Sequence, residues 1–173
     1  MEHPWHETLA MERRGAAVMD AVFEPQFIIA KATRAHQRQG IDRFHICKKD
    51  GRIIYRVDYK TDWKAHQTRN IVLEHVSVRK GTERIKAGWV HTTVADLIVS
   101  YVPDDDTAYV MPIMEIRNAW PDIQTVFPLK RTSTPDRNGG YYTDFYAVPI
   151  EWLKRNRIIT KEIKAVGCQL RLW

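Results

Sequence analysis

The chain has 173 residues, 44% of them hydrophobic and 28% charged, and its formal net charge of +6 favours an anionic partner such as nucleic acid. No apolar run reaches the roughly 20 residues of a membrane-spanning helix, and the first residues lack the order of a signal peptide. We expect one domain over residues 1–173, with a core over about 5–120 and a less regular extension over 121–173. Cys47 and Cys168 form no metal-ligand spacing, which favours a reduced setting.

The first expected element is a helix from about Trp5 to Phe23, ended by Pro25. Its apolar residues recur at three- and four-residue steps, as one buried stripe requires. These residues are Trp5, Leu9, Ala16, Met19 and Phe23. Glu12 falls on the same stripe, where a carboxylate is costly unless a metal ion or a basic neighbour such as Arg13 or Arg14 compensates it. Glu12 is therefore a candidate site residue.

A strand-rich centre is expected next. Residues 27–32 predict a short strand, and a polar, basic segment runs through Gly40. Residues 42–47 and 53–60 predict a hairpin about Asp50-Gly51, which is a strong turn signal. A polar loop over 61–69 leads to a strand over 70–78, and a basic loop over 79–86 leads to Gly88-Trp89.

The second half is expected to be more mixed. Residues 94–102 predict a strand or a short helix plus a strand, 108–114 another strand, and 115–120 a helical turn stopped by Pro121. The polar, glycine-rich residues 131–142 predict a mobile loop, and 152–157 a short helix. The fold class is thus α+β or α/β, with a central mixed β-sheet flanked by helices.

The predicted hairpin carries the most informative residues of the chain. Side chains alternate between the faces of a strand, so Asp58 and Lys60 share a face and Tyr59 has the other. Carboxylates hold a hard cation such as Mg²⁺ through oxygen, and a nearby lysine can orient an attacking water or offset charge on a phosphate. Asp42, at the mouth of the preceding strand, is a candidate second ligand.

The register of this hairpin decides where Asp42 lies. A two-residue loop pairs 43 with 58, stacks Phe44 on Val57 and turns Asp42 to the wrong face. A three-residue loop with Gly51 in the left-handed conformation places Asp42 opposite Asp58. Alternatively, Asp42 precedes regular pairing, where Gly40 permits an irregular backbone. We favour this last arrangement because it keeps the apolar face intact.

A helix carrying Glu, then an Asp, then Asp-x-Lys on the next strand resembles the PD-(D/E)XK nuclease superfamily, with its restriction-endonuclease-like fold. Further segments are similar to phage-type, largely uncharacterised members. They are Lys60-Thr61-Asp62, Thr68-Arg69-Asn70, the apolar strand ending in Glu74, Gly88-Trp89 and Ala95-Asp96. The resemblance covers about residues 5–120. Arg69 stands where that pattern has Gly, and Asp58 where Glu is commoner.

The resemblance implies a Mg²⁺-dependent endonuclease that hydrolyses DNA, with Mn²⁺ as a substitute cation. Asp42 and Asp58 would be metal ligands together with the Tyr59 carbonyl. Lys60 would be the catalytic lysine and Glu12 a carboxylate near the site. Weaker candidates are Thr68 and Glu74.

Nearby basic residues are candidates for contacts with the DNA backbone. They are Lys31, Arg34, Arg38, Arg79, Lys80, Arg84 and Lys86. The expected setting is the cytoplasm of a bacterial host for a phage-encoded protein, with DNA as partner and no membrane; a homodimer stays open. The alternative function is a non-catalytic DNA-binding or structural, assembly protein on the same fold.

Overall fold

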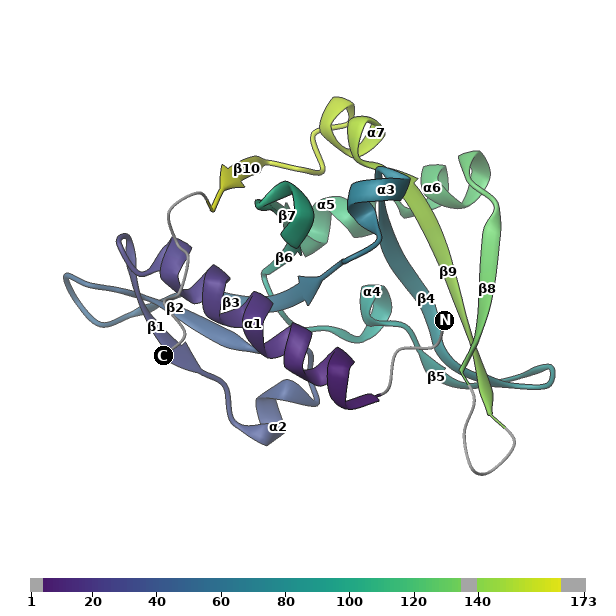
Figure 1. Cartoon of the computed structure of the whole chain (residues 1–173), viewed down its shortest axis with the longest axis horizontal. Coiled ribbons are helices and arrows are strands. Elements are labelled where there is room, and N and C mark those ends of the chain that lie inside the picture. Colours follow the sequence, from purple (N-terminus) through teal and green to yellow (C-terminus); the bar gives the residue numbers. More distant parts are fainter. Residues whose placement is uncertain (1–4, 135–139, 166–173) are drawn as a thin grey trace.

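The structure, a computed structural model, describes residues 5–134 and 140–165 and, within the first helix, the side chains from Ala10 onward. Two β-sheets form the body of the protein, and one long helix crosses the first of them (Figure 1). Within the described ranges, no helix is both long and apolar enough to span a membrane.

Sheet A has six strands in the order β1-β2-β3-β6-β7-β10. They are β1 (Phe27–Lys31), β2 (Arg43–Cys47), β3 (Ile53–Thr61), β6 (Leu97–Val102), β7 (Thr107–Pro112) and β10 (Lys161–Lys164). The central pair β3 and β6 is parallel, whereas the other described pairs in this sheet are antiparallel. The expected α+β class with a mixed, helix-flanked sheet is confirmed.

Sheet B has four strands in the order β5-β4-β9-β8, and its described pairs are antiparallel. They are β4 (Asn70–Lys80), β5 (Glu83–Ala87), β8 (Leu129–Thr134) and β9 (Tyr141–Pro149). Sheet B is therefore assembled from two hairpins that are far apart in the sequence, and β4 and β9 form its centre.

The helices are one long element and several short ones. They are α1 (Trp5–Phe23), α2 (Arg34–Gln37), α3 (Ala65–Thr68), α4 (Trp89–Thr92), the 3₁₀ turn η1 (Pro103–Asp105), α5 (Ile113–Asn118), α6 (Trp120–Val126) and α7 (Ile150–Arg155). Two apolar cores result. The first lies between α1 and one face of sheet A, and the second between the other face of sheet A, sheet B and the short helices.

Helix α1 packs tightly against the end of β3 at Gly15. A Cβ atom at this position would lie 2.1 Å from Oγ1 of Thr61, so only glycine lets the helix rest against the end of β3. Met19 and Phe23, one and two turns later, are buried against residues of β3, β6 and β7. The glycine thereby sets the height of α1 over the strand that carries the candidate site.

The predicted stripe on α1 is partly wrong. Ala16, Met19 and Phe23 pack as expected, but Glu12 is exposed. The reason is that residues 10–14 are exposed apart from the half-buried Met11, so this part of α1 lies before the close contact with β3 that begins at Gly15. The side chains of Trp5 and Leu9 lie outside the described part of the chain.

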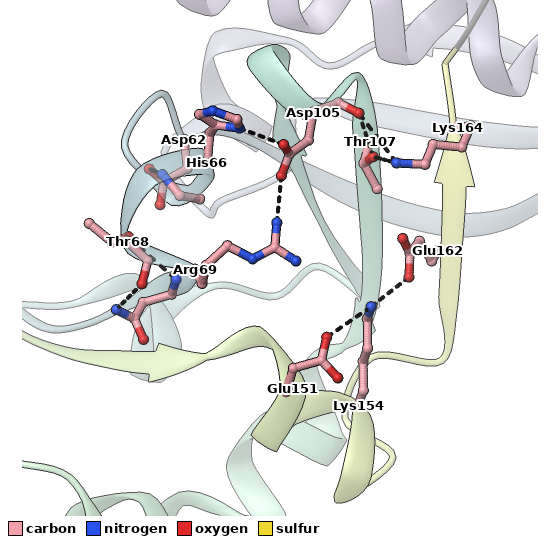
Figure 2. A network of polar contacts seen from close by, with 12 residues as sticks. Asp62, His66, Thr68, Arg69, Asp105, Thr107, Glu151, Lys154, Glu162 and Lys164 are labelled. Atoms are coloured by element: carbon pink, nitrogen blue, oxygen red, sulfur yellow. Dashed lines mark hydrogen bonds and ion pairs between the residues drawn. The ribbon is translucent and has the colours of Figure 1, made fainter.

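A polar network joins the two sheets at one end (Figure 2). The Asp105 carboxylate of η1 accepts a hydrogen bond from Nη1 of Arg69 at 2.9 Å and contacts Nδ1 of His66 at 2.5 Å. Lys154 of α7 pairs with Glu162 of β10 at 2.7 Å. Arg69 has a left-handed φ of +54°, a conformation that glycine adopts more readily than other residues, so a non-glycine residue holds this backbone shape in the turn before β4.

Three segment predictions are wrong. Pro121 does not stop a helix but lies in the first turn of α6, where its missing N–H costs no hydrogen bond. The predicted loop over 79–86 is the end of β4 and strand β5, and that over 131–142 contains the end of β8 and the start of β9, with 135–139 outside the described residues. Strands β5 and β8 are edge strands exposed along nearly their whole length, so they lack the apolar alternation that identifies a strand.

Candidate active site

Asp58 and Lys60 point away from α1, into the space between the two sheets. Their neighbours Val57 and Tyr59 belong to the core under α1, so alternation along β3 sends Asp58 and Lys60 to the opposite face. The Asp58 side chain is 3% exposed, and Nζ of Lys60 donates to its Oδ1 at 2.9 Å. Nζ also lies 5.8 Å from the ring centre of Trp89. Lys60 is thus held between a carboxylate and an aromatic face.

The second carboxylate oxygen of Asp58 has no partner. Oδ2 is buried without a hydrogen bond from any described residue, which is costly for a charged group. Burial raises the pKa of Asp58 to about 7; Lys60 opposes this rise, and the nearby Asp42 carboxylate adds to it. A bound cation would relieve both the unpaired oxygen and the repulsion between the two carboxylates.

Asp42 lies immediately before β2. Its N–H donates to the Val57 carbonyl at 2.8 Å, and its Oδ2 accepts the Tyr59 N–H at 3.0 Å. Gly40, two residues earlier, has a left-handed φ of +76°. Asp42 therefore precedes the regular pairing of β2, as we favoured, but the register is that of the other alternative, because Arg43 pairs with Val57 and Gly51 is left-handed with a φ of +71°.

The pairing that accompanies this position differs from the expected one. Arg43 pairs with Val57 and His45 with Tyr55, with a bulge after His45, so Phe44 does not stack on Val57. The face of β2 that turns to α1 is polar. Arg43 forms a 2.8 Å ion pair with Asp20 of α1, and His45 Nε2 lies 3.1 Å from the hydroxyl of Tyr59. The apolar-face argument is wrong because paired polar residues fill that face.

The oxygen ligands suit a hard cation. Backbone N–H and C=O of one strand residue point to the same side, so the Tyr59 carbonyl faces the side from which Asp42 accepts its N–H. Two carboxylates and a carbonyl match Mg²⁺, which binds few protein oxygens and keeps several waters. In the described ranges no three His, Cys, Asp or Glu side chains come together as a metal site.

The site opens into a groove. Two cavities of about 820 and 700 Å³ share the lining residues Gln37, Gly40, Asp58, Lys60 and Thr61, and together they are called the groove below. Glu12 and Asp42 line the first cavity and Glu74 the second. Glu12, although exposed, thus lines the same hollow as Asp42, Asp58 and Lys60.

The predicted DNA-contacting residues fall into three groups. Lys31, Arg38 and Lys86 line the groove, and none has an ion-pair partner among the described residues. Arg34, Lys80 and Arg84 are exposed but do not line it. Arg79 is held by the buried Asp144 at 2.6 Å.

The two weaker candidates also separate. Glu74 lines the groove, where its Oε1 accepts a hydrogen bond from the Ser77 hydroxyl. Thr68 does not line the groove; its Oγ1 accepts the Asn70 N–H at 3.3 Å and its carbonyl accepts from the Asn70 side chain. Thr68 thus shapes the turn into β4.

Sequence reasoning missed the roles of Trp89 and Arg13. In the sequence, Trp89 is part of the Gly88-Trp89 motif, which does not indicate a role for the side chain. A Cβ on Gly88 would lie 2.0 Å from the Glu74 carbonyl oxygen, so glycine brings α4 against β4 and delivers the indole to Lys60. Arg13 lines the groove without an ion-pair partner in the described chain. Its only sequence signal was its place beside Glu12.

No known protein family profile matches the chain, and no curated protein matches it in sequence. Among solved structures, it is similar to a bacterial homing endonuclease, I-Ssp6803I, with a TM-score of 0.45 and 19% identity. The likeness covers 61% of this chain and 69% of that one. A likeness of this size leaves the function to be argued from the site.

Proposed function

We propose that the protein is a Mg²⁺-dependent nuclease that hydrolyses phosphodiester bonds of DNA. The observation that carries this proposal is the buried, unpartnered Oδ2 of Asp58 beside the Asp42 carboxylate and the Lys60 ammonium group. Buried carboxylates are normally fully paired, and perturbed pKa values gather where a ligand completes the site. Mn²⁺ would substitute for Mg²⁺ because both prefer oxygen ligands.

Asp42, Asp58 and the Tyr59 carbonyl would hold the cation. When bound, it would polarise the phosphate and lower the pKa of a coordinated water. Lys60 gives one N–H to Asp58 and keeps two further donors. These donors would position the attacking water or a phosphate oxygen, and the ammonium charge would offset the negative charge that develops at phosphorus. Glu12 would act from the groove wall near the carboxylates.

The walls of the groove support an anionic polymer as substrate. Lys31, Arg38 and Lys86, with Arg13, present positive charge that no described acidic side chain neutralises by an ion pair. Such cations attract the nucleic-acid backbone through counterion release and position it without reading its sequence.

The test is cleavage of supercoiled plasmid DNA with Mg²⁺ or Mn²⁺, with EDTA as the metal-free reference. Lys60→Ala should lower the cleavage rate about 100-fold or more, the loss typical when a group that stabilises developing charge is removed. Lys49→Ala, which removes an exposed lysine of the β2–β3 turn, is the matched control and should leave the rate unchanged. DNA binding without cleavage by the wild-type protein would instead favour the non-catalytic alternative.

A further inference from the structure

The two faces of sheet B use their cations differently. On the face turned to the short helices, the Asp144 side chain is fully buried and binds Nε of Arg79 at 2.6 Å and Nε of Arg131 at 2.7 Å. These two arginines are committed to a structural carboxylate. The opposite face also borders the groove, because Val72 and Glu74 on it line the groove next to Ile71 of the first face.

Strand pairing extends this groove-side face beyond the groove. Glu74 is directly opposite Phe145, and Phe145 is directly opposite Lys130. Directly opposed residues share a face, so Lys130 lies on the groove-side face of β8, two strands and about 10 Å from Glu74. Lys130 is exposed and has no ion-pair partner in the described ranges. Nothing in its sequence context had distinguished it from other surface lysines.

The groove-side face is otherwise weakly charged. Its acidic residue Glu74 is engaged by the Ser77 hydroxyl, and the Thr143 hydroxyl donates to the Ser77 carbonyl at 3.0 Å. Lys86 at the groove rim and Lys130 carry two positive charges against the one negative charge of Glu74, so this set of residues has a net positive charge. Across the groove, Arg13, Lys31 and Arg38 form a second set of unpaired cations on the side of α1 and α2.

We infer that the groove-side face of sheet B, defined by Glu74, Phe145 and Lys130 with Lys86 at its rim, is a binding wall for duplex DNA. Unpaired cations flank Asp58 and Lys60 on two sides. A duplex presents two phosphate backbones, whereas a single strand presents one. The strand to be cut would lie along α1 and α2, and its complement along sheet B. This inference rests on the proposed function.

The test is binding in EDTA, where no cleavage occurs, with a duplex and with each of its single strands. The variant is Lys86→Ala/Lys130→Ala in the full chain, and the control is Lys49→Ala/Lys161→Ala, which removes the same charge at two exposed lysines outside the groove lining. Thermal unfolding checks that both variants fold. The groove variant should weaken duplex binding at least about tenfold and reduce the slope of log K against log salt by about 1.8, since each lost phosphate contact contributes about 0.9.

Single-strand binding should change less than duplex binding, and the control should keep the wild-type slope. An equal loss for duplex and single strands, or an equal loss in the control, overturns the inference. The outcome is independent of hydrolysis. If the wild-type protein never cleaves DNA but the Lys86→Ala/Lys130→Ala variant loses duplex binding specifically, the binding wall is supported and the proposed activity is wrong. If the Lys86→Ala/Lys130→Ala variant binds the duplex normally and still cleaves it, the binding wall is wrong and the proposed activity is unaffected.

Discussion

Asp58 and Asp144 are both buried carboxylates, yet they differ in how their charge is met. Two arginines satisfy Asp144, and the hydrogen bond from Arg131, followed by that from Arg79, holds its pKa below the ordinary value. Asp58 has one lysine and one unpaired oxygen, and its pKa is raised to about 7. Both carboxylates are buried, but Asp144 in sheet B has a complete set of ion-pair partners and Asp58 in sheet A does not. Asp58 is where a ligand would gain most.

The largest expected effect is on the free energy of unfolding, which should respond differently to substitution of Asp144 and of Asp58. Asp144→Asn leaves the guanidinium groups of Arg79 and the half-exposed Arg131 without their counter-charge and should lower the free energy of unfolding by about 2 kcal/mol, since a hydrogen bond to a charged group contributes about 1.5–3 kcal/mol. Asp58→Asn removes a charge that is poorly compensated, so at pH 8 in EDTA stability should stay the same or rise, while metal-dependent cleavage is lost. Urea unfolding and plasmid cleavage measure the two effects. A comparable loss of stability in both variants would show that Asp58 is a structural residue like Asp144.

An intermediate effect concerns the pH dependence of stability in metal-free protein. The folded-state pKa of Asp58 is about 7 against an ordinary 3.8, so the folded state binds more protons between these values and stability falls as pH rises. Burial of His45 lowers its pKa from 6.5 to about 4, so its contribution is present above pH 6.5 and is lost as pH falls through 4. Each slope is at most about 1.4 kcal/mol per pH unit.

These two slopes oppose each other and partly cancel in the wild-type protein. Relative to wild type, Asp58→Asn should make stability rise more steeply with pH, and His45→Gln should make it rise less steeply or fall. Urea unfolding at several pH values in EDTA gives the slopes. If neither substitution alters the slope, the two groups do not titrate as their burial predicts.

The smallest effect is expected at Trp89, which touches Lys60. Trp89→Leu keeps an apolar side chain but removes the aromatic face, and loss of a cation–π contact of about 1 kcal/mol should slow single-turnover cleavage about fivefold. Trp89→Phe keeps a ring and should slow it less. Unfolding measurements on both variants show whether slower cleavage comes from a displaced Lys60 or from lost packing of Trp89. Equal rates for the Leu and Phe variants would show that the ring does not position Lys60.

Much of the fold was predictable where one physical pattern dominates. Helix α1 has a regular apolar spacing, and β1 to β4 have apolar strand composition bounded by turn signals, so their positions agree with expectation within a few residues. Asp58 and Lys60 were assigned to one face because strand alternation needs no tertiary information. In contrast, β5 and β8 are stabilised by their neighbours in sheet B and not by their own composition.

The remaining parts of the site depend on partners distant in the chain. The β2 pairing could not be read from apolar stacking because Arg43 is buried against Asp20 and His45 against Tyr59. The exposure of Glu12 depends on where the close contact of α1 with β3 begins, which is at Gly15 beside Thr61. Asp144, which commits Arg79 to a structural role, lies 65 positions away from it. Such pairings are invisible to local spacing.

The interleaved strand order has a consequence for synthesis. The candidate residues from Glu12 to Lys60 leave the ribosome early, yet β4 pairs on both sides, with β5 and with β9, and β9 ends at Pro149. A nascent or truncated chain that stops before β9 leaves one long edge of β4 open, and we expect such a chain to aggregate rather than to cut DNA. The proposed activity would therefore appear only after β9 has been synthesised, some ninety residues after the reactive groups have been made.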